Sequence, residues 1–306
     1  MKTKQLISDL QEAKVGKVVE NEPLSKHTTW KIGGPADVFI EPDGVDALSK
    51  AMDIINSYDL SWRVIGRGSN LLVDDEGIEG VVIKLGQNIG HLEKNDSTIR
   101  VGGGLSFIKL ATIMSKEGMS GLEFAGGIPG TVGGAVFMNA GAHGSDMSHI
   151  LVQARVLFPD GRLVWINNED MNFSYRTSRL QKEKGICVEA ILQLQAGDKE
   201  KVTHEMKEYK QYRRETQPWN YPCAGSVFRN PLPNHAGALI EKAGLKGYRH
   251  GGAQISEQHA NFIVNVDQAK AADVLTIIEH VKKTIYQLYN VEMYTEVEIV
   301  ERKQIL

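Results

Sequence analysis

Four short segments of the chain are rich in glycine and other small residues. They are Gly66–Asn70 (GRGSN), Gly102–Gly104 (GGG), Gly126–Gly134 (GGIPGTVGG) and Cys223–Ser226 (CAGS). Glycine tolerates positive φ and leaves backbone N–H groups unobstructed, and successive N–H groups form a concave site for anions such as pyrophosphate. Several such loops in one chain indicate an elongated, phosphate-bearing ligand, which points towards a dinucleotide-like cofactor.

The two longer glycine segments differ in specificity. Gly66–Asn70 matches neither the dinucleotide fingerprint, because Leu71 replaces its third glycine, nor the P-loop, so a plain strand–loop turn explains it about equally well. Gly126–Gly134 contains a rigid turn at Pro129 and then a run of small residues. Close backbone packing explains one or two glycines, whereas a run of this length favours a cofactor-binding loop.

Three polar residues have side chains suited to catalysis, but none is distinctive by itself. Arg176 has a guanidinium that binds carboxylates or phosphates in bidentate fashion, although a solvated surface arginine is more common. Ser226 lies in a tight glycine turn that is not a nucleophile elbow, and serine is a usual turn residue. Glu296 shares strand parity with Glu292 and Glu298, which is typical of an exposed polar face.

Composition excludes several classes of protein. The 306 residues have a formal net charge of -3, and no strongly basic block supports nucleic-acid binding. Two cysteines are too few for a disulfide framework, and the histidines lack metal-ligand spacing, so we expect no metal site. No apolar run approaches the about 20 residues that span a bilayer, and we expect no signal peptide. A cytoplasmic protein without a membrane partner is the expectation.

Helical and strand patterns alternate in the first part of the chain and then give way to strands. The helices expected are an opening helix around Leu6–Leu10, then Val45–Ile55, Phe107–Lys116, Lys199–Arg214 and Ala269–Tyr289, the last with a buried stripe that includes Leu288. The strands expected are Val38–Ile40, Val64–Ile65, Val81–Leu85, Val152–Phe158, Leu163–Ile166, Ile186–Leu194 and Val291–Val300. The alternation in Ile186–Leu194 predicts a strand with one buried face.

Taken together, the motifs resemble one family, the UDP-N-acetylenolpyruvoylglucosamine reductases (MurB) of bacterial peptidoglycan precursor synthesis. The resemblance follows the family's order through nearly the whole chain. The matching segments are Asn21–Gly34, Gly66–Leu72, Gly121–Ala142, Tyr175–Ser178, Tyr221–Pro231, Ala236–Gly247 and Glu292–Val300. The longer form of the family has an inserted loop whose tyrosine covers the substrate. This chain has no counterpart of that loop and resembles the shorter form.

The resemblance implies an α+β protein with the FAD-binding fold of the vanillyl-alcohol oxidase/PCMH type. Two lobes, 1–85 and 86–200, would hold FAD non-covalently between them, and a substrate lobe, 201–306, would return its closing strand 291–300 to the active site. The residues implied to bind FAD are Gly66, Arg67, Gly68, Ser69, Asn70, Leu71, Gly126, Gly127, Ile128, Pro129, Gly130, Thr131, Gly133, Gly134, Ala135 and Asn139.

The implied reaction passes a hydride from NADPH to the flavin and then to UDP-N-acetylglucosamine enolpyruvate, giving UDP-N-acetylmuramate. Arg176 would stabilise charge that develops on the substrate carboxylate, and Ser226 would donate the proton. Glu296 would have to be protonated to donate to the oxyanion, which requires a raised pKa. Arg229 and Asn230 would contact the substrate.

Two other classes of function stay open at this point. An FAD-dependent alcohol or sugar oxidase of the same fold would need no arginine–serine–glutamate set. A non-catalytic nucleotide-binding protein would be colourless when purified. The partners expected are small molecules alone, and we expect a monomer.

Overall fold

The computed structural model describes residues 2–303 and divides the chain into two compact units. The first comprises the chain up to Glu20, Val38–Gly66 and Gly80–Arg213, and the second comprises Asn21–Asp37, Arg67–Glu79 and the chain from Arg214 onwards. The chain therefore enters the second unit three times. The predicted three-lobe division of residues 1–85, 86–200 and 201–306 stays a prediction, and its residues 1 and 304–306 lie outside the described part.

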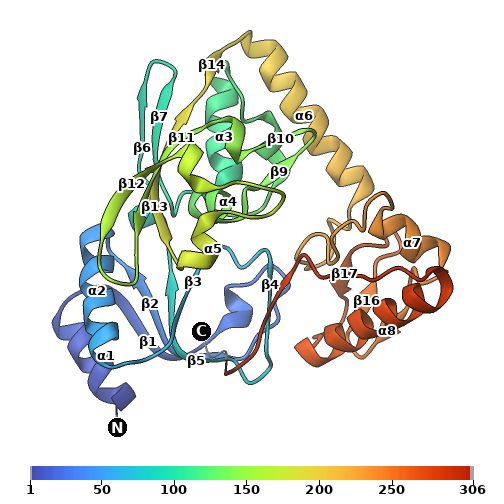
Figure 1. Cartoon of the computed structure of the whole chain (residues 1–306), viewed down its shortest axis with the longest axis horizontal. Helices are drawn as coiled ribbons and strands as arrows, with labels where there is room; N and C mark the ends of the chain where they lie inside the picture. The colour runs from blue at the N-terminus through green and yellow to red at the C-terminus, as the bar shows by residue number, and fades with distance from the viewer. Residues whose placement is uncertain (1, 304–306) are drawn as a thin grey trace. The chain divides into compact units, whose positions relative to one another are not determined.

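One part of the first unit is a four-stranded sheet of order β1-β2-β5-β3. Its elements are α1 (Lys2–Glu12), β1 (Gly16–Pro23), β2 (Pro35–Pro42), α2 (Val45–Ser57), β3 (Trp62–Ile65) and β5 (Ile78–Lys84). Helices α1 and α2 lie side by side (Figure 1) and turn apolar stripes, including Leu6 and Met52, into one hydrophobic core with Val38 and Val81 of the sheet. Burial of these stripes supplies most of the helices' stability.

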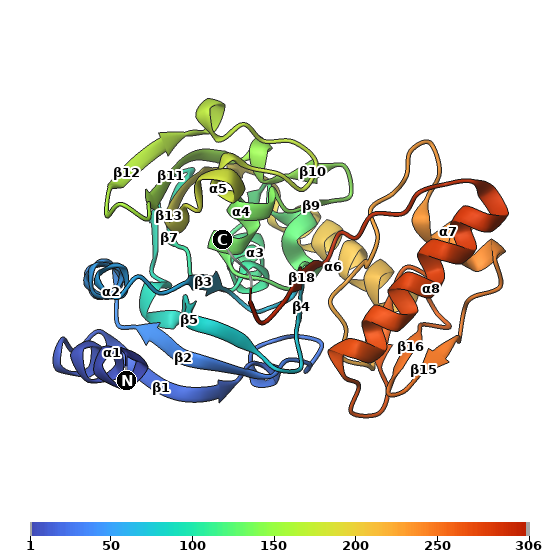
Figure 2. The same cartoon turned by 60° about the horizontal axis from the view of Figure 1, so that its bottom comes forward.

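The other part of the first unit is a five-stranded antiparallel sheet of order β12-β11-β13-β7-β6, with α3 and α4 packed against it (Figure 2). Its elements are β6 (Leu92–Asn95), β7 (Thr98–Gly102), α3 (Phe107–Lys116), α4 (Val132–Met138), β11 (Leu151–Leu157), β12 (Leu163–Asn167), α5 (Arg179–Glu183), β13 (Ile186–Gln193) and α6 (Lys199–Thr216). The short strands are β8 (Met119–Ser120), β9 (Gly141–Ala142), β10 (Ser145–Asp146) and β14 (Gln195–Ala196). A second core forms here around Phe107 and Val136.

The second unit combines two short sheets with two helices. Its elements are β4 (Leu71–Val73), α7 (Ala236–Lys242), β15 (Arg249–His250), β16 (Ala253–Ile255), β17 (Ile263–Asn265), α8 (Ala271–Tyr289) and β18 (Glu298–Val300). Strands β15, β16 and β17 form an antiparallel sheet, and β18 pairs in parallel with β4. Helix α8 packs on β15 and β16, and its buried residues join a third core with Trp30 and Phe228. Trp30 donates its indole N–H to the carbonyl of Ile263 (2.8 Å).

Most predicted elements are confirmed, with three corrections. Strand β13 is buried on both faces, since Cys187 and Glu189 are as inaccessible as the apolar residues between them. The predicted closing strand Val291–Val300 is a strand only over Glu298–Val300. Leu288 is 57% exposed and does not belong to the buried stripe of α8. The mixture of helices with mainly antiparallel sheets fits the α+β class.

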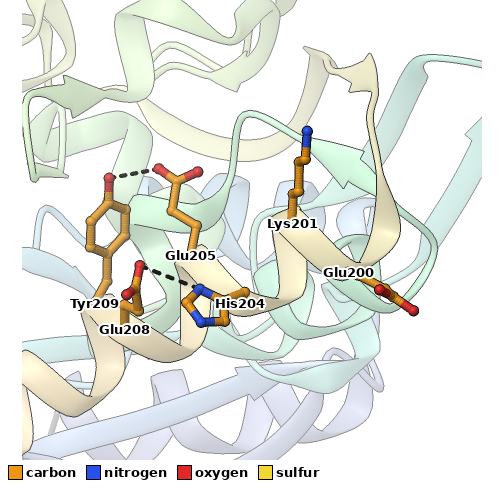
Figure 3. A pocket seen from close by; sticks show the side chains of 6 residues that line it. All are labelled: Glu200, Lys201, His204, Glu205, Glu208 and Tyr209. Atoms are coloured by element: carbon orange, nitrogen blue, oxygen red, sulfur yellow. Dashed lines mark hydrogen bonds and ion pairs between the residues drawn. The ribbon is translucent and has the colours of Figure 1, made fainter.

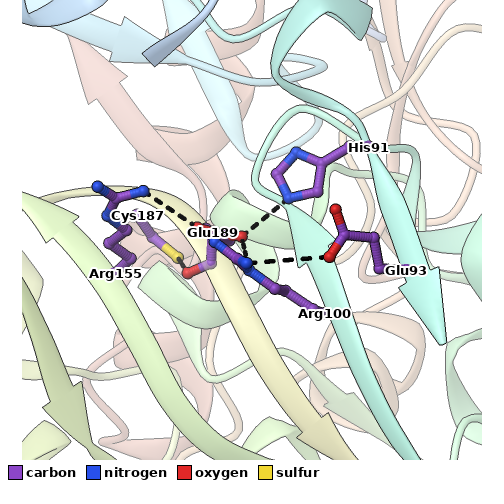
Figure 4. A network of polar contacts seen from close by, with 6 residues as sticks. All are labelled: His91, Glu93, Arg100, Arg155, Cys187 and Glu189. Carbon is purple, nitrogen blue, oxygen red and sulfur yellow. Dashed lines mark hydrogen bonds and ion pairs between the residues drawn. The ribbon is translucent and has the colours of Figure 1, made fainter. Parts of the chain in front are cut away.

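An ion-pair network explains why the polar face of β13 is buried (Figure 4). The Glu189 carboxylate is only 1% exposed and accepts hydrogen bonds from Arg100 and from His91 (2.9 Å), and Arg155 lies 3.5 Å away. Burial acts to raise the pKa of Glu189, but the hydrogen bonds from Arg100 and His91 outweigh it and hold that pKa below its usual range. Cations from neighbouring strands thus allow a carboxylate on a central strand.

Candidate active site and cofactor loops

The turn that carries Ser226 is built by its neighbours. Gly225 has φ +78°, a conformation that favours glycine, and Val227 and Phe228 are buried after it. The N–H of Val227 donates to the carbonyl of Asn261 (2.8 Å). Ser226 itself is half-buried. Ser226 therefore lies directly beside a buried, hydrogen-bonded segment of backbone.

Glu296 lies directly across from this turn in the second unit. The N–H groups of Glu296 (2.7 Å) and Val297 (3.4 Å) both donate to the carbonyl oxygen of Val227, and Phe228 forms a bridge with Thr295. Two successive N–H groups on one acceptor are the pattern of a β-bulge, a feature that redirects side chains and is frequent beside active sites. The structure thus brings the backbones at Ser226 and Glu296 together, although Glu296 precedes β18 rather than belonging to it.

Burial separates Glu296 from the glutamates that share its parity. Glu292 and Glu298 are exposed, whereas Glu296 is half-buried. The simple interpretation of an exposed polar strand face therefore fails at this one position.

The loop Gly66–Asn70 makes contacts that a plain turn does not require. Gly68 has φ +59°, and a Cβ there would meet the carbonyl oxygen of His27 at 2.5 Å. Asn70 donates from its side-chain amide to the carbonyl of Glu296 (3.2 Å), and its own carbonyl accepts from the N–H of Glu298 (2.9 Å). A residue predicted to bind the cofactor thus contacts the backbone of the predicted catalytic glutamate.

Packing explains more of Gly126–Gly134 than the sequence indicates. A Cβ added to Gly126 would lie 2.6 Å from the Met206 side chain, and one added to Gly127 would lie 2.5 Å from the Arg213 side chain. A Cβ added to Gly133 would lie 2.6 Å from the carbonyl oxygen of Cys187. Close packing therefore accounts for three of these glycines, and the expectation that it would explain only one or two was wrong. Cofactor binding by the loop stays a prediction.

Other residues of this loop leave room for a ligand. Gly134 is exposed, and a Cβ there would meet only the Thr131 hydroxyl, at the ordinary contact distance of 3.4 Å. Thr131 caps α4 by accepting from the N–H of Gly134 (3.3 Å), and a Cβ on Gly66 would lie 2.6 Å from the same hydroxyl. Gly66 and Thr131 are thus adjacent, so the structure brings the beginning of one predicted cofactor loop to the other.

Asn139 has a structural function at the end of α4. Its backbone is left-handed (φ +43°) and its side chain is 3% exposed. The amide donates to Asp146 (3.3 Å) and to the carbonyl of Ser174 (3.2 Å), and the side-chain oxygen accepts from the N–H of Ser148 (3.0 Å). The Asn139 side chain therefore forms its described hydrogen bonds with neighbouring protein groups, and its contact with the cofactor stays a prediction.

Two buried polar atoms test whether these loops fit FAD. The Thr29 hydroxyl oxygen and one carboxylate oxygen of Glu123 have no hydrogen-bond partner among the described residues. Thr29 adjoins the first loop, because its N–H donates to the carbonyl of Gly68 (3.2 Å), and Glu123 begins the 3₁₀ turn that contains Gly126 and Gly127. An unsatisfied buried polar group costs about 1–3 kcal/mol. Each acceptor, considered within its own unit, suits a donor group such as a hydroxyl or an amine of FAD.

Arg176 occupies a strained position in the first unit. It has φ +54° in a two-residue turn closed by a bridge between Ser174 and Thr177. Its guanidinium lies 5.2 Å from the centre of the exposed Tyr175 ring, and its carbonyl accepts from the side chain of Gln181 (3.0 Å). A left-handed arginine is uncommon, and such strain is found preferentially at functional sites.

Arg229 and Asn230 are exposed residues of the second unit. The N–H of Arg229 donates to the carbonyl of Tyr294 (2.9 Å), which extends the pairing at Glu296. The side-chain oxygen of Asn230 accepts from the N–H of Ala236 (3.0 Å), at the start of α7. Both residues are exposed, and their contact with a substrate stays a prediction.

A hollow of about 550 Å³ lies on α6, lined by Glu200, Lys201, His204, Glu205, Glu208 and Tyr209 (Figure 3). All six side chains come from one helix, and none is a predicted site residue. Within residues 2–303, no His, Cys, Asp and Glu residues are grouped as a metal site would require, and no helix is long and apolar enough to cross a membrane.

Residues that the sequence did not single out also contribute. Thr29 and Glu123 lie inside segments that carried the resemblance, whereas Asn261 lies outside all of them. Each matters through a hydrogen bond that it makes or leaves unmade. The available signal at Glu123 and Asn261 was a polar residue flanked by apolar ones, and Thr29, which follows Thr28, had no such signal.

The family models define a FAD-binding protein. The model "FAD binding domain" matches residues 36–167, and the model "UDP-N-acetylenolpyruvoylglucosamine reductase, C-terminal domain" matches residues 217–300. The chain belongs to the UDP-N-acetylenolpyruvoylglucosamine reductase (MurB) family.

Relatives match this chain over nearly its full length. The UDP-N-acetylenolpyruvoylglucosamine reductase of Anoxybacillus flavithermus is 64% identical over 97% of this chain and 99% of its own. That of Bacillus subtilis is 63% identical over 96% and 98%. The crystal structure of MurB from Thermus caldophilus has a TM-score of 0.78 and 36% identity, and covers 93% of this chain and 98% of its own. The predicted resemblance is confirmed.

Proposed function

We propose that this chain catalyses the reaction of its family, the NADPH-dependent reduction of UDP-N-acetylglucosamine enolpyruvate to UDP-N-acetylmuramate in peptidoglycan precursor synthesis. FAD, when bound, would supply the hydride chemistry that links NADPH to the enolpyruvyl group. Membership of the family favours this activity over the sugar oxidase and over the non-catalytic nucleotide-binding protein. We call consumption of NADPH the first half-reaction and consumption of the enolpyruvyl substrate the second.

We assign the proton-transfer chemistry of the second half-reaction to Ser226 and Glu296. Ser226 donates the proton to the carbon beside the carboxylate, and Glu296 in its protonated form donates a hydrogen bond to the oxyanion. The observation that supports this assignment is the pairing of Val227 with Glu296 at 2.7 Å, which fixes the two chain segments against each other. Serine is a weak acid in water, so its function depends on such positioning.

Arg176 supplies the positive charge. Its guanidinium binds the substrate carboxylate and stabilises the negative charge that grows there as the hydride arrives. The assignment rests on the motif Tyr175–Ser178 of the family, since the left-handed backbone at Arg176 is shared by turn residues such as Lys14 and Lys184. Arg229 and Asn230 contact the substrate.

The cofactor is held non-covalently by the loops Gly66–Leu71 and Gly126–Ala135. The partnerless acceptors of Thr29 and Glu123 and the open face of Gly134 support this location. We also propose that the protein is cytoplasmic and that it is a monomer. Analytical ultracentrifugation with and without FAD tests the monomeric state.

The purified protein tests the proposal directly. We expect it to be yellow, with one FAD per chain released by acid or heat, and to consume NADPH over repeated turnovers only when the enolpyruvyl nucleotide is present. A protein that takes up no flavin after reconstitution, or that reduces oxygen in place of the nucleotide, would contradict the function.

A further inference from the structure

One peptide group in the second unit has polar contacts on both of its sides. The peptide that joins Val227 to Phe228 accepts at its carbonyl from the N–H of Glu296 (2.7 Å). At its N–H it donates to the side-chain oxygen of Asn261 (2.9 Å). A chain of hydrogen bonds therefore runs from Asn261 through this peptide to the backbone of the glutamate.

Asn261 fixes this segment at two further points. Its side-chain N–H donates to the carbonyl of Phe228 (2.8 Å), and its own carbonyl accepts from the N–H of Val227 (2.8 Å). The N–H of Val227 belongs to the same peptide plane as the carbonyl of Ser226, so this last contact restricts the backbone at Ser226. One residue thus binds the backbone directly after the serine three times.

The surroundings of Asn261 favour a single orientation of its side chain. Asn261 is 5% exposed, lies in the turn between β16 and β17, and donates its N–H to Nδ1 of His259 (3.2 Å). Its amide has the donor and the acceptor on the sides that Phe228 requires. A buried amide with both ends satisfied is held firmly, because releasing either end leaves a polar group without a partner.

We propose that Asn261 is a positioning residue for the second half-reaction, which holds the Ser226 turn against the segment of Glu296. This inference rests on the proposed functions of Ser226 and Glu296. Neither the amide nor the backbone of Asn261 takes part in proton transfer. Asn261 sets the distance and the direction over which Ser226 delivers its proton. Reaction rates change strongly when reacting groups are displaced by about 1 Å.

Two substitutions test the proposal. Asn261→Leu removes both side-chain hydrogen bonds at similar volume, and we expect it to slow the second half-reaction by about 100-fold. Asn261→Asp keeps the acceptor for the N–H of Phe228 but loses the donor to its carbonyl. A protonated aspartic acid regains that donor, and burial raises the pKa of such a carboxyl. The rate of Asn261→Asp relative to wild type should therefore recover as the pH falls.

Asn265 provides the matched control. It also donates to a carbonyl, that of Trp30 (3.0 Å), and accepts from a backbone N–H, that of Ala269 (2.9 Å), in the same unit. Wild type and both aspartate variants contain His259, so recovery in acid that this histidine caused by itself would also appear in Asn265→Asp. We expect Asn265→Asp to show no recovery with acid and no selectivity between the half-reactions.

Stopped-flow absorbance separates the two half-reactions, and thermal unfolding confirms that each variant is folded. The expected result is a slow second half-reaction, a first half-reaction within twofold of wild type, and recovery in acid for Asn261→Asp alone. Equal slowing of both half-reactions, a rate ratio independent of pH, or the same behaviour in Asn265→Asp would overturn the inference. If Asn261→Leu does not fold, Asn261→Asp decides the matter. Wild-type behaviour of Ser226→Ala would instead refute the function proposed for Ser226, on which the inference about Asn261 rests.

Discussion

The side-chain amide of Asn70 lies 3.2 Å from the backbone carbonyl of Glu296. Asn70 belongs to a loop assigned to the cofactor, and Glu296 is the residue assigned to the oxyanion. The carbonyl of Asn70 also accepts from the N–H of Glu298, so the loop is held to the closing segment on both sides of Val297. A change in this loop is therefore expected to affect Glu296 without any direct contact between side chains.

Glu296→Gln should impair turnover more than substrate binding. The amide is isosteric and still has a hydrogen-bond donor, but this donor is far less acidic than a carboxylic acid and stabilises an oxyanion less. The charge that Glu296 stabilises develops only as the hydride arrives. An interaction made mainly in the transition state affects kcat, so we expect kcat to fall about 100-fold with little change in KM. Steady-state kinetics check this.

Glu292→Gln and Glu298→Gln are the controls for that change. Both glutamates are exposed and flank Glu296 on the same strand parity. We expect turnover near wild type for both. If all three variants behave alike, Glu296 is an ordinary surface glutamate and its catalytic assignment is wrong.

Ser226→Ala should separate the half-reactions. NADPH consumption in the first half-reaction needs no proton from the serine, so its rate should not change. The second half-reaction should slow by about 100-fold or more, the usual scale for a lost general acid. Rapid-mixing absorbance measures both rates, and equal slowing of the two would identify Ser226 as a turn residue alone.

Arg176→Lys and Arg176→Ala should differ in a graded way. Lysine keeps the charge but loses the bidentate geometry, whereas alanine loses both. We expect kcat/KM to fall by about tenfold for lysine and about 1000-fold for alanine, with KM rising as well because the substrate already carries a carboxylate. A lysine variant as inactive as the alanine variant would indicate that the bidentate geometry of the guanidinium matters more than its charge.

A pair of neighbouring glycines separates packing from cofactor binding. A Cβ on buried Gly133 would lie 2.6 Å from the carbonyl oxygen of Cys187, whereas one on exposed Gly134 meets nothing closer than 3.4 Å. We expect Gly133→Ala to lower the melting temperature of the apoprotein. Gly134→Ala should leave it unchanged or raise it, since alanine favours the helix by about 1 kcal/mol.

The affinity for FAD then identifies the loop. If the cofactor lies against Gly134, the added methyl group should weaken FAD binding by about tenfold although the fold is intact. Fluorescence titration of the apoprotein measures this. Unchanged affinity in Gly134→Ala would remove this glycine from the cofactor site.

Local periodicity made most helices and several central strands, such as β5 and β13, predictable. The expected helix Phe107–Lys116 is α3 to the residue, because its apolar residues repeat with helical spacing and Ser106 caps it. The periodicity of α8 was equally clear, but Leu288 lies in the last turn, beyond the core that the rest of the stripe fills. A pattern records which residues suit a core and does not record where the core ends.

Long-range pairing made the site only partly predictable. The family motifs identified Ser226 and Glu296, but the bulge that joins them depends on pairing between distant segments and leaves no periodic signal. Asn261 was missed for the same reason, since its importance lies in the backbone groups that it contacts. The glycines of Gly126–Gly134 were identified, but three of them also pack closely against Met206, Arg213 and Cys187, which the sequence does not reveal.

Glu189→Gln should destabilise the protein at neutral pH. Loss of one partner from a buried ion pair costs about 3–5 kcal/mol, and because Arg100 is 47% exposed we expect the smaller cost of about 2 kcal/mol. Asp160 is the control, because its pair with Arg162 is exposed and Asp160→Asn should change nothing measurable. Urea unfolding at pH 7 compares the three proteins.

The same network should make stability depend on pH in acid. The pKa of Glu189 is lower in the folded protein than its usual value of 4.5, so the unfolded chain binds more protons between the two values. The stability that ionised Glu189 contributes is complete above pH 4.5 and is lost as the pH falls through the lowered folded value. Glu189→Gln should therefore lose less stability than wild type between pH 5 and the acid limit of folding, as measured by unfolding midpoints. Parallel curves for the two proteins would show that protonation of other carboxylates, and not of Glu189, causes the loss in acid.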